Sequence, residues 1–522
     1  MLQSEFISGA ANTSGHSVLW LGRNDSSTND DDTLAYACSN LICIVRHNSE
    51  ATKVTHSLTR HHGRVNALAL TQRASWWTLY SAADDGQVVA WRKRECEKFD
   101  VLAEVDLKAP LMLVTAMFCP SGDSDLVFTA DGQGNVYGLI LQHSKNYFEE
   151  LQTLVFPPAQ TPNAIHVCGM SEDVTGLFVG GVDGHIHVYA GRTSSLVLKQ
   201  SKLEYVGLLS GREDWVTCID HCLTQDGILF ASGSQDGKIR LWRVTASASM
   251  EQRELMVEAG DLQEMENDQE EDEAVEEGVE GQDVLVTEES TGEARLVFQL
   301  SDLKFAVHLE ALLIGHEDWV TSVHWLPRIE GSSTQPIFST SMDRNMIVWL
   351  PDPTSGIWVP ATRMGDVGGT LGGSVGANLL GFVSGVVSPH ENRVLGIGYG
   401  GSFHLWAEET KSKKWRAMPF LSGHFGAVND LAWSHSGNLL FTGSSDQTCR
   451  VFARFSGGEY FELSRPQVHG YDINCLALSP SSLTLYSGGD EKLVRIFEAP
   501  GVVVQGIKLL TQEQIADTDR YG

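Results

Sequence analysis

Residues 313–349, LIGHEDWVTSVHWLPRIEGSSTQPIFSTSMDRNMIVW, decide how this chain is interpreted. The stretch contains a Gly-His pair, an apolar run, a serine-rich strand that ends at Asp343, and Trp349 six residues after that Asp. A closely similar block precedes it, LLSGREDWVTCID followed by LFASGSQDGKIRLW, and it keeps the same spacing between Asp236 and Trp242. Because two copies of one pattern indicate repeated structural units, we expect a repeat protein.

Each copy has the pattern of a small antiparallel sheet. The segment TSVHW alternates between two faces, IFSTS is a second strand, and a tight turn then leads into a third strand, MIVWL. We expect an indole, a hydroxyl, an imidazole and a carboxylate to form one buried chain of hydrogen bonds, because an unpaired buried polar group costs about 1–3 kcal/mol. Its members are Trp349, either Ser339 or Ser341, His316 and Asp343. This is the pattern of WD-type β-propeller blades, which bury their faces by stacking in a ring.

Nine such units follow one another when the chain is aligned on the third strand. The predicted fold is all-β: a seven-bladed propeller over residues 1–409, then two blades of an incomplete second propeller over 410–500. Residues 501–522 show no further unit and are expected to form a tail. Unit five has Arg212 where the pattern calls for His. The residues expected to hold the blades together are His62, Asp85, Trp91, Asp183, Asp236, Trp242, His316, Asp343, Trp349, Trp406, His424, Asp446, His469 and Asp490.

Negative charge is concentrated in one part of the chain. The formal net charge is −30, and residues 251–293 carry 18 acidic side chains and one basic side chain, which is −17 of that total. Charge of a single sign with few aromatic residues predicts a disordered insertion, between the third and fourth strands of unit five. A solvated loop is the favoured interpretation, and a surface that attracts a basic partner is the alternative. The rest of the chain is mildly acidic, which disfavours a large nucleic-acid-binding face.

The N-terminus and the cysteines predict a soluble intracellular protein. The segment MLQSEFISGA lacks the basic region and apolar core of a signal peptide. No apolar run approaches the ~20 residues that span a bilayer. The nine cysteines include no Cys-x-x-Cys pair, and an odd number argues against a secreted disulfide framework.

Motifs that could carry catalysis are weak. Residues 372–376, GGSVG, match the G-x-S-x-G pattern around a hydrolase nucleophile, here Ser374, but they lie in a glycine-rich loop without the required strand–turn–helix context. The same run lacks the Lys-Ser/Thr ending of a phosphate-binding loop. His185 and His187 share a strand face and could ligate a metal, yet without a third ligand a solvated blade edge is favoured. We therefore expect no enzyme activity, no metal and no cofactor.

Several segments resemble the family of Elongator complex subunit 2 beyond the repeat pattern itself. They include GREDWVTCID, GHEDWVTSVHW, SMDRNMIVWLPDPTSGIW and SGGDEKLVRIFEAP, and the run MGDVGG at 364–369 makes the likeness specific. The resemblance is close from about residue 203 to 500. It implies a non-catalytic scaffold that holds the largest subunit and the catalytic subunit 3 together while the wobble uridine (U34) of certain tRNAs is modified. It further implies contact with tRNA only through the complex, no membrane association, and a place in cytoplasm and nucleus.

Two other classes of protein remain as alternatives. A ubiquitin-ligase substrate receptor usually ends a blade with Trp-Asp-x-Arg, whereas the Trp positions here are followed by Arg92, Arg243, Leu350 and Ala407. Such a receptor is one form of the first class, the generic WD-repeat adaptor or signalling scaffold, which stays open. A hydrolase would require Ser374 to lie on a true nucleophile elbow. The chain also departs from the resembled family, because its second propeller stops after two blades and residues 370–378 are interpreted as an insertion.

Overall fold

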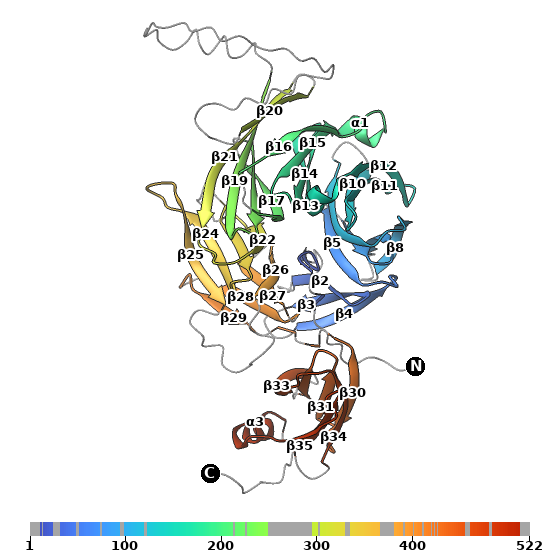
Figure 1. Cartoon of the computed structure of the whole chain (residues 1–522), viewed down its shortest axis with the longest axis vertical. Coiled ribbons are helices and arrows are strands. Elements are labelled where there is room, and N and C mark those ends of the chain that lie inside the picture. Colours follow the sequence, from blue (N-terminus) through green and yellow to red (C-terminus); the bar gives the residue numbers. More distant parts are fainter. Residues whose placement is uncertain are drawn as a thin grey trace.

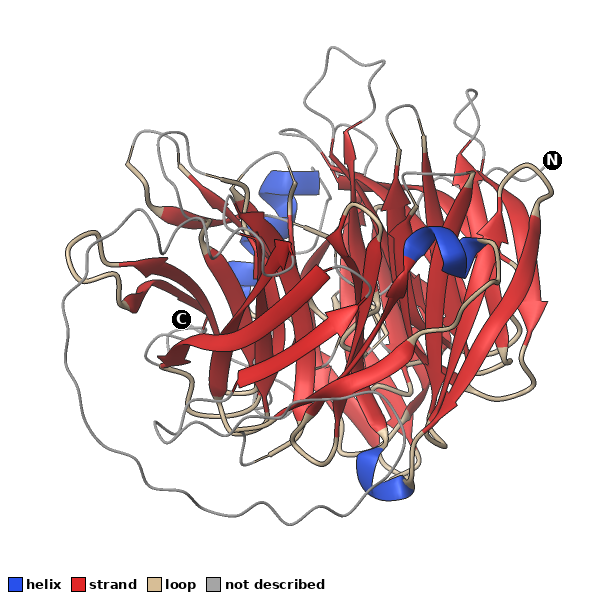
Figure 2. Ribbon diagram, turned by 90° about the horizontal axis from the view of Figure 1, so that it is seen from above, coloured by secondary structure: helices blue, strands red, loops and turns tan. Residues whose placement is uncertain are grey.

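The computed structural model describes residues 11–511 apart from 13, 24–31, 48–51, 74–75, 94–98, 120–122, 212–213, 225–226, 249–294, 301–302, 329–334, 366–380, 390–391, 400, 410–411, 419, 422, 425, 455–459 and 480–482. Strands make up nearly all of the regular structure in this part of the chain (Figure 2). The described helices are η1 (Pro158–Gln160), α1 (Thr193–Val197) and α3 (Gly501–Thr511). The predicted all-β fold is confirmed.

The strands form nine antiparallel sheets, numbered here in chain order. Sheet 1 contains β1 (Val18–Arg23), β2 (Asp32–Cys38), β3 (Leu41–His47) and β4 (Thr52–Thr59); sheet 2 contains β5 (Val65–Gln72), β6 (Trp77–Ala83), β7 (Gln87–Lys93) and β8 (Phe99–Asp106). Sheet 3 contains β9 (Leu111–Phe118), β10 (Ser124–Asp131), β11 (Asn135–Gln142) and β12 (Tyr147–Val155); sheet 4 contains β13 (Pro162–Ser171), β14 (Val174–Gly181), β15 (Ile186–Arg192) and β16 (Glu204–Leu209). Sheet 5 contains β17 (Val216–Thr224), β18 (Gly227–Ser234), β19 (Lys238–Ala248), β20 (Arg295–Leu300) and β21 (Leu303–Ile314).

The later sheets follow the same plan. Sheet 6 contains β22 (Val320–Trp325), β23 (Ile337–Ser341), β24 (Asn345–Pro351) and β25 (Trp358–Gly365). Sheet 7 contains β26 (Phe382–Val387), β27 (Arg393–Gly398), β28 (Phe403–Glu408) and β29 (Trp415–Met418). Sheet 8 contains β30 (Val428–Trp433), β31 (Leu439–Ser444), β32 (Thr448–Arg454) and β33 (Tyr460–Val468); sheet 9 contains β34 (Ile473–Leu478), β35 (Thr484–Gly489) and β36 (Val494–Glu498).

Sheets 1 to 7 contact one another in cyclic order. The first strand of each sheet lies innermost, and β1, β5, β9, β13, β17, β22 and β26 contact their neighbours in this sequence, with β26 contacting β1 (Figure 1). A separate cluster of buried apolar side chains fills each space between consecutive sheets, including the space between sheets 7 and 1. Stacking therefore buries the faces that a single sheet would expose.

Polar side chains also link one inner strand to the next. Asn66 Nδ2 donates to the carbonyl of Leu111 at 2.8 Å, and Thr321 Oγ1 donates to the carbonyl of Phe382 at the same distance. Ser384 Oγ donates at 2.6 Å to the carbonyl of Gly15, in the segment that precedes β1. This last bond joins sheet 7 to the segment before sheet 1, although the two residues are 369 positions apart in the sequence. It therefore closes the cycle of sheets.

The strand pattern shows how the sequence repeat relates to the sheets. In sheet 7, β29 pairs with β28, so this sheet extends beyond residue 409. The predicted limits of the two propellers at 409 and 500 stay predictions.

In sheet 5, β19 pairs with β21, and β20 forms a hairpin with β21. The acidic segment 251–293 therefore connects the third strand to this hairpin, although the segment itself lies outside the described residues, as do Arg212 and Ser374.

Sheets 8 and 9 pack against each other around a core that α3 helps to cover. Ile507 of α3 is buried in this core together with Phe441 and Leu485. The predicted tail thus begins with a helix that belongs to this pair of sheets (Figure 1). Of the helices in the described part of the chain, none has the length and apolarity needed to cross a membrane.

Candidate functional site

The hydrogen-bond chain of sheet 6 has the expected composition. Trp349 Nε1 donates to Ser339 Oγ at 2.8 Å, and the same hydroxyl lies 2.8 Å from His316 Nε2. His316 Nδ1 is 2.8 Å from Asp343 Oδ2. Of the two candidate hydroxyls, Ser339 is the one in the chain, since Ser341 Oγ instead donates to a backbone carbonyl and accepts from the backbone N–H of Asp343. The side chains of all four residues are shielded from solvent. Each hydrogen bond in the chain therefore replaces a hydrogen bond to water.

The Asp343 carboxylate is held in its charged form. Burial alone would raise its pKa, but hydrogen bonds from His316 and from the backbone N–H groups of Glu317 and Asn345 outweigh burial and lower the pKa below its ordinary value. The carboxylate thereby fixes the turn between β23 and β24 as well as the imidazole.

In sheet 2 the imidazole of the chain comes from His61 rather than from the predicted His62. His61 Nδ1 is 3.2 Å from Asp85, and His61 Nε2 is 2.7 Å from Ser81 Oγ, to which Trp91 Nε1 also donates. His62 contributes only its backbone N–H to Asp85 in this set. The sequence holds a signal that separates the two, because His61 and His316 both stand four residues before the start of an inner strand.

In sheet 9 the carboxylate of the chain comes from Glu491 rather than from the predicted Asp490. His469 Nδ1 is 2.8 Å from Glu491, whereas Asp490 accepts a hydrogen bond from the side chain of Asn474. Lys492, directly after Glu491, has a φ of 59°, as Arg344 does after its own acidic residue with 68°. The turn therefore has the usual register and contains no extra residue. Glu491 also stands six residues before Phe497, the spacing found elsewhere.

The remaining predicted residues occupy variants of the same arrangement. In sheet 8, His424 contacts Asp446 at 2.8 Å and Thr442 at 2.7 Å. In sheet 5, Asp236 forms an ion pair with Arg240 at 2.9 Å, and Trp242 Nε1 donates to Ser232 Oγ. Arg240 thus supplies a cation beside this carboxylate, at a position that the sequence pattern does not mark.

Sheets 4 and 7 depart further from the pattern. Asp183 accepts from the backbone N–H of His185 and lies 3.0 Å from His187 Nε2, so the two histidines considered as metal ligands share this carboxylate. Trp406 is partly buried and packs against the core between sheets 6 and 7. The repeated His–Asp pairs are therefore parts of blades, each tied to its own sheet.

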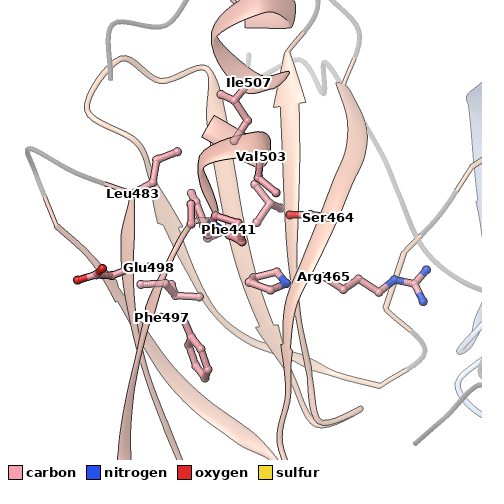
Figure 3. A pocket seen from close by; sticks show the side chains of 13 residues that line it. Phe441, Ser464, Arg465, Leu483, Phe497, Glu498, Val503 and Ile507 are labelled. Atoms are coloured by element: carbon pink, nitrogen blue, oxygen red, sulfur yellow. The ribbon is translucent and has the colours of Figure 1, made fainter. Parts of the chain in front are cut away.

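An apolar pocket lies between α3 and the sheets of the C-terminal pair (Figure 3). Its volume is about 280 Å³, and Phe441, Val503 and Ile507 are among the side chains that line it. Ser464 and Arg465 stand at its polar side, and the Arg465 guanidinium is directed away from the hollow. Glu498 is the one carboxylate among the residues that line the pocket, and neither a histidine nor a cysteine lines it beside this group.

Two tryptophans of the repeated EDWVT segments are exposed on the ring. Trp215 and Trp319 directly precede the neighbouring inner strands β17 and β22, and their exposed fractions are 45% and 48%. In both places the preceding Asp accepts a hydrogen bond from the Trp backbone N–H, so the two Asp-Trp pairs have the same local hydrogen bond. Exposed aromatic side chains on a fixed backbone are typical anchors of protein–protein interfaces.

Comparison with known proteins agrees with this geometry. The family model described as "WD domain, G-beta repeat" matches residues 52–92, 203–243, 415–452 and 462–498. Each match begins on or just before the outer strand of one sheet and continues through three strands of the next, so each sequence repeat joins two sheets. The repeats and the sheets define the chain as a WD-repeat protein of the β-propeller type.

Its relatives within that class are specific. The chain is 32% identical over 506 residues to "Elongator complex protein 2" of Danio rerio, covering 93% of this chain and 55% of that protein. It is 30% identical to the protein of the same name in Homo sapiens, covering 88% of this chain and 52% of that protein. The Schizosaccharomyces pombe protein is 29% identical over 497 residues. The chain is thus a WD-repeat relative of Elongator complex protein 2, and it spans about half the length of these relatives.

Proposed function

We propose that this chain is a non-catalytic scaffold subunit of an Elongator-type complex. The observation that carries the proposal is the similarity to proteins named Elongator complex protein 2 over about nine-tenths of the chain. The chemistry of the described residues supports it, because the recurring His–Asp pairs, as in sheets 6 and 8, are hydrogen-bonded within their own blades. Surfaces rather than a reactive cluster are then left to carry the function.

The partners in this proposal are the largest subunit and the catalytic subunit 3 of such a complex. The scaffold holds them together and so supports modification of the wobble uridine, U34, of tRNA. Contact with tRNA passes through the other subunits, because a chain with a net charge of −30 repels the phosphate backbone. The proposed places of action are the cytoplasm and the nucleus.

The exposed tryptophans offer a direct test of the scaffold. The tagged chain is expressed in the cells from which it comes, purified by affinity, and its partners are identified by mass spectrometry. We expect the other Elongator subunits to copurify in constant ratio. The double change Trp215→Ala and Trp319→Ala should lower their recovery at least several-fold, because both anchors of one face are removed.

The matched control is Tyr147→Ala, which removes an aromatic side chain, 57% exposed, from the outer strand β12. Recovery of the subunits should be unchanged in this variant. Purification of the unmodified chain without Elongator subunits but with a ubiquitin-ligase adaptor would contradict the proposal. That result would favour the generic WD-repeat adaptor as the function.

A further inference from the structure

A cluster of histidines and one carboxylate lies among the inner strands of the ring. His166 comes from β13, Asp220 and His221 from β17, and His324 from β22. His166 Nε2 lies 2.7 Å from His221 Nδ1, and His324 Nδ1 lies 3.3 Å from Asp220 Oδ2. One ligand atom each from His166, Asp220 and His221 can be chosen so that all three lie within 4.8 Å of one another. These residues are separate from the hydrogen-bond chains of the blades.

The backbone holds the carboxylate of this cluster in place. Asp220 Oδ1 accepts from the backbone N–H of His221 at 2.8 Å, and Oδ2 accepts from the backbone N–H of Trp325 at 3.3 Å. The indole of Trp325 in turn donates to the carbonyl of Asp220. The site is therefore built from three neighbouring sheets whose strands are rigidly paired, which is the kind of support that a preorganised ligand set requires.

The side chains of the cluster shift one another's pKa values. Burial, aided by the neighbouring His221, lowers the pKa of His166 to about 3, and burial also lowers the pKa of His221. Burial would raise the pKa of Asp220, but the hydrogen bond from His324 and the nearby imidazoles lower it to about 2.

We propose that His166, His221 and Asp220 bind a divalent transition-metal ion, with Zn²⁺ as the preferred ion. Two imidazoles and one carboxylate form a ligand set that Zn²⁺ accepts, whereas Mg²⁺ and Ca²⁺ prefer oxygen ligands throughout. His324 acts as a positioning residue, since its ring contacts the carboxylate from the side of β22. A bound ion would join sheets 4 and 5 at the ring centre by bonds that the blade pattern does not supply.

Titration with Zn²⁺ tests the site on the full chain, purified without a histidine tag and stripped with a chelator. We expect saturable binding of one Zn²⁺ per chain in a calorimeter, and a rise in melting temperature because the ion binds the folded state. Mg²⁺ at the same concentration should leave the melting temperature unchanged. His166→Ala and Asp220→Asn should each weaken Zn²⁺ binding by at least about tenfold, since even second-shell changes at metal sites cost 10–100-fold.

Two further variants keep the test decisive. Asp220→Asn keeps an oxygen for the backbone N–H of His221 but loses the oxygen that accepts from Trp325, so its melting temperature in chelator is measured first and its Zn²⁺ affinity is compared at a temperature where the variant is folded. His185→Ala is the matched control, because it alters the other histidine–aspartate group, near Asp183, and should leave the affinity unchanged. Equal affinity in His166→Ala, Asp220→Asn and the unmodified chain, or no saturable Zn²⁺ binding at all, would overturn the proposal.

Discussion

Replacing Asp343 by Ala probes how strongly one hydrogen-bond chain supports its blade. The change removes the acceptor for His316 Nδ1 and for the backbone N–H groups of Glu317 and Asn345. Water can reach the two backbone groups because Glu317 is exposed and Asn345 is only partly buried. The imidazole of His316 is fully enclosed, so its orphaned donor dominates the cost, which we expect to be about 1–3 kcal/mol of unfolding free energy.

The assay combines chemical unfolding with hydrogen exchange of the sheet 6 amides, because a chain of this length can unfold in parts. Glu317→Ala is the matched control, since it removes a neighbouring carboxylate of the same charge that is exposed. Asp343→Asn should lose less than Asp343→Ala, because an amide oxygen can still accept one bond. The reasoning is refuted if Asp343→Ala unfolds like the Glu317→Ala control and the amides of β23 and β24 exchange at unchanged rates.

Three further predictions concern stability in acid, the histidine that belongs to the hydrogen-bond chain of sheet 2, and the acidic insertion. Burial would raise the pKa of Asp446, but hydrogen bonds from His424 and Thr448 lower it to about 2. This carboxylate therefore stabilises the fold fully above about pH 4, and its contribution decreases as the pH falls towards 2. The difference in unfolding free energy between the unmodified chain and Asp446→Asn should shrink over that interval. His61→Ala should cost about 1–3 kcal/mol and His62→Ala less than about 0.5 kcal/mol in the same unfolding assay, and equal losses would contradict the assignment of His61. Deleting residues 251–293 should change the melting temperature little, because long surface connections cost little entropy, and strong hydrogen-exchange protection within this segment in the full chain would argue against it.

The parts of the fold that the sequence predicts are those that a single hairpin determines. Asp343 and Trp349 are six residues apart because one closes the turn and the other lies on the strand that leaves it, so their spacing follows from local geometry. The run of apolar and small residues on the two strands of the same hairpin agrees with their burial on both faces. Repetition of these local features is enough to predict an all-β protein built from blades.

The parts that alignment on the Asp and Trp positions does not predict are the exact residue in a loop or turn and the contacts between repeats. The choice between His61 and His62 is fixed by the start of β5, which alignment on the Asp and Trp positions does not define. Asp490 and Glu491 are adjacent and chemically alike, and Glu491 is distinguished by its spacing of six residues from Phe497 and by the left-handed turn residue that follows it. The cluster of His166 and His221 joins residues 55 positions apart on two strands, and no local spacing marks it.

The hydrogen bond between Ser384 and Gly15 marks the closure of the ring of sheets, and this closure requires that both residues have been synthesised. A ribosome that adds about 5–20 residues per second needs roughly 20–70 s to make the 369 residues that separate the two partners. During that time the apolar face of sheet 1, which includes Val18, Trp20 and Tyr36, has no sheet 7 to cover it. Sheets 2 to 6 can meanwhile form in order from neighbouring hairpins. We expect nascent chains interrupted before β26 to engage chaperones through this uncovered face, whereas chains that have passed β29 should release them as the ring closes.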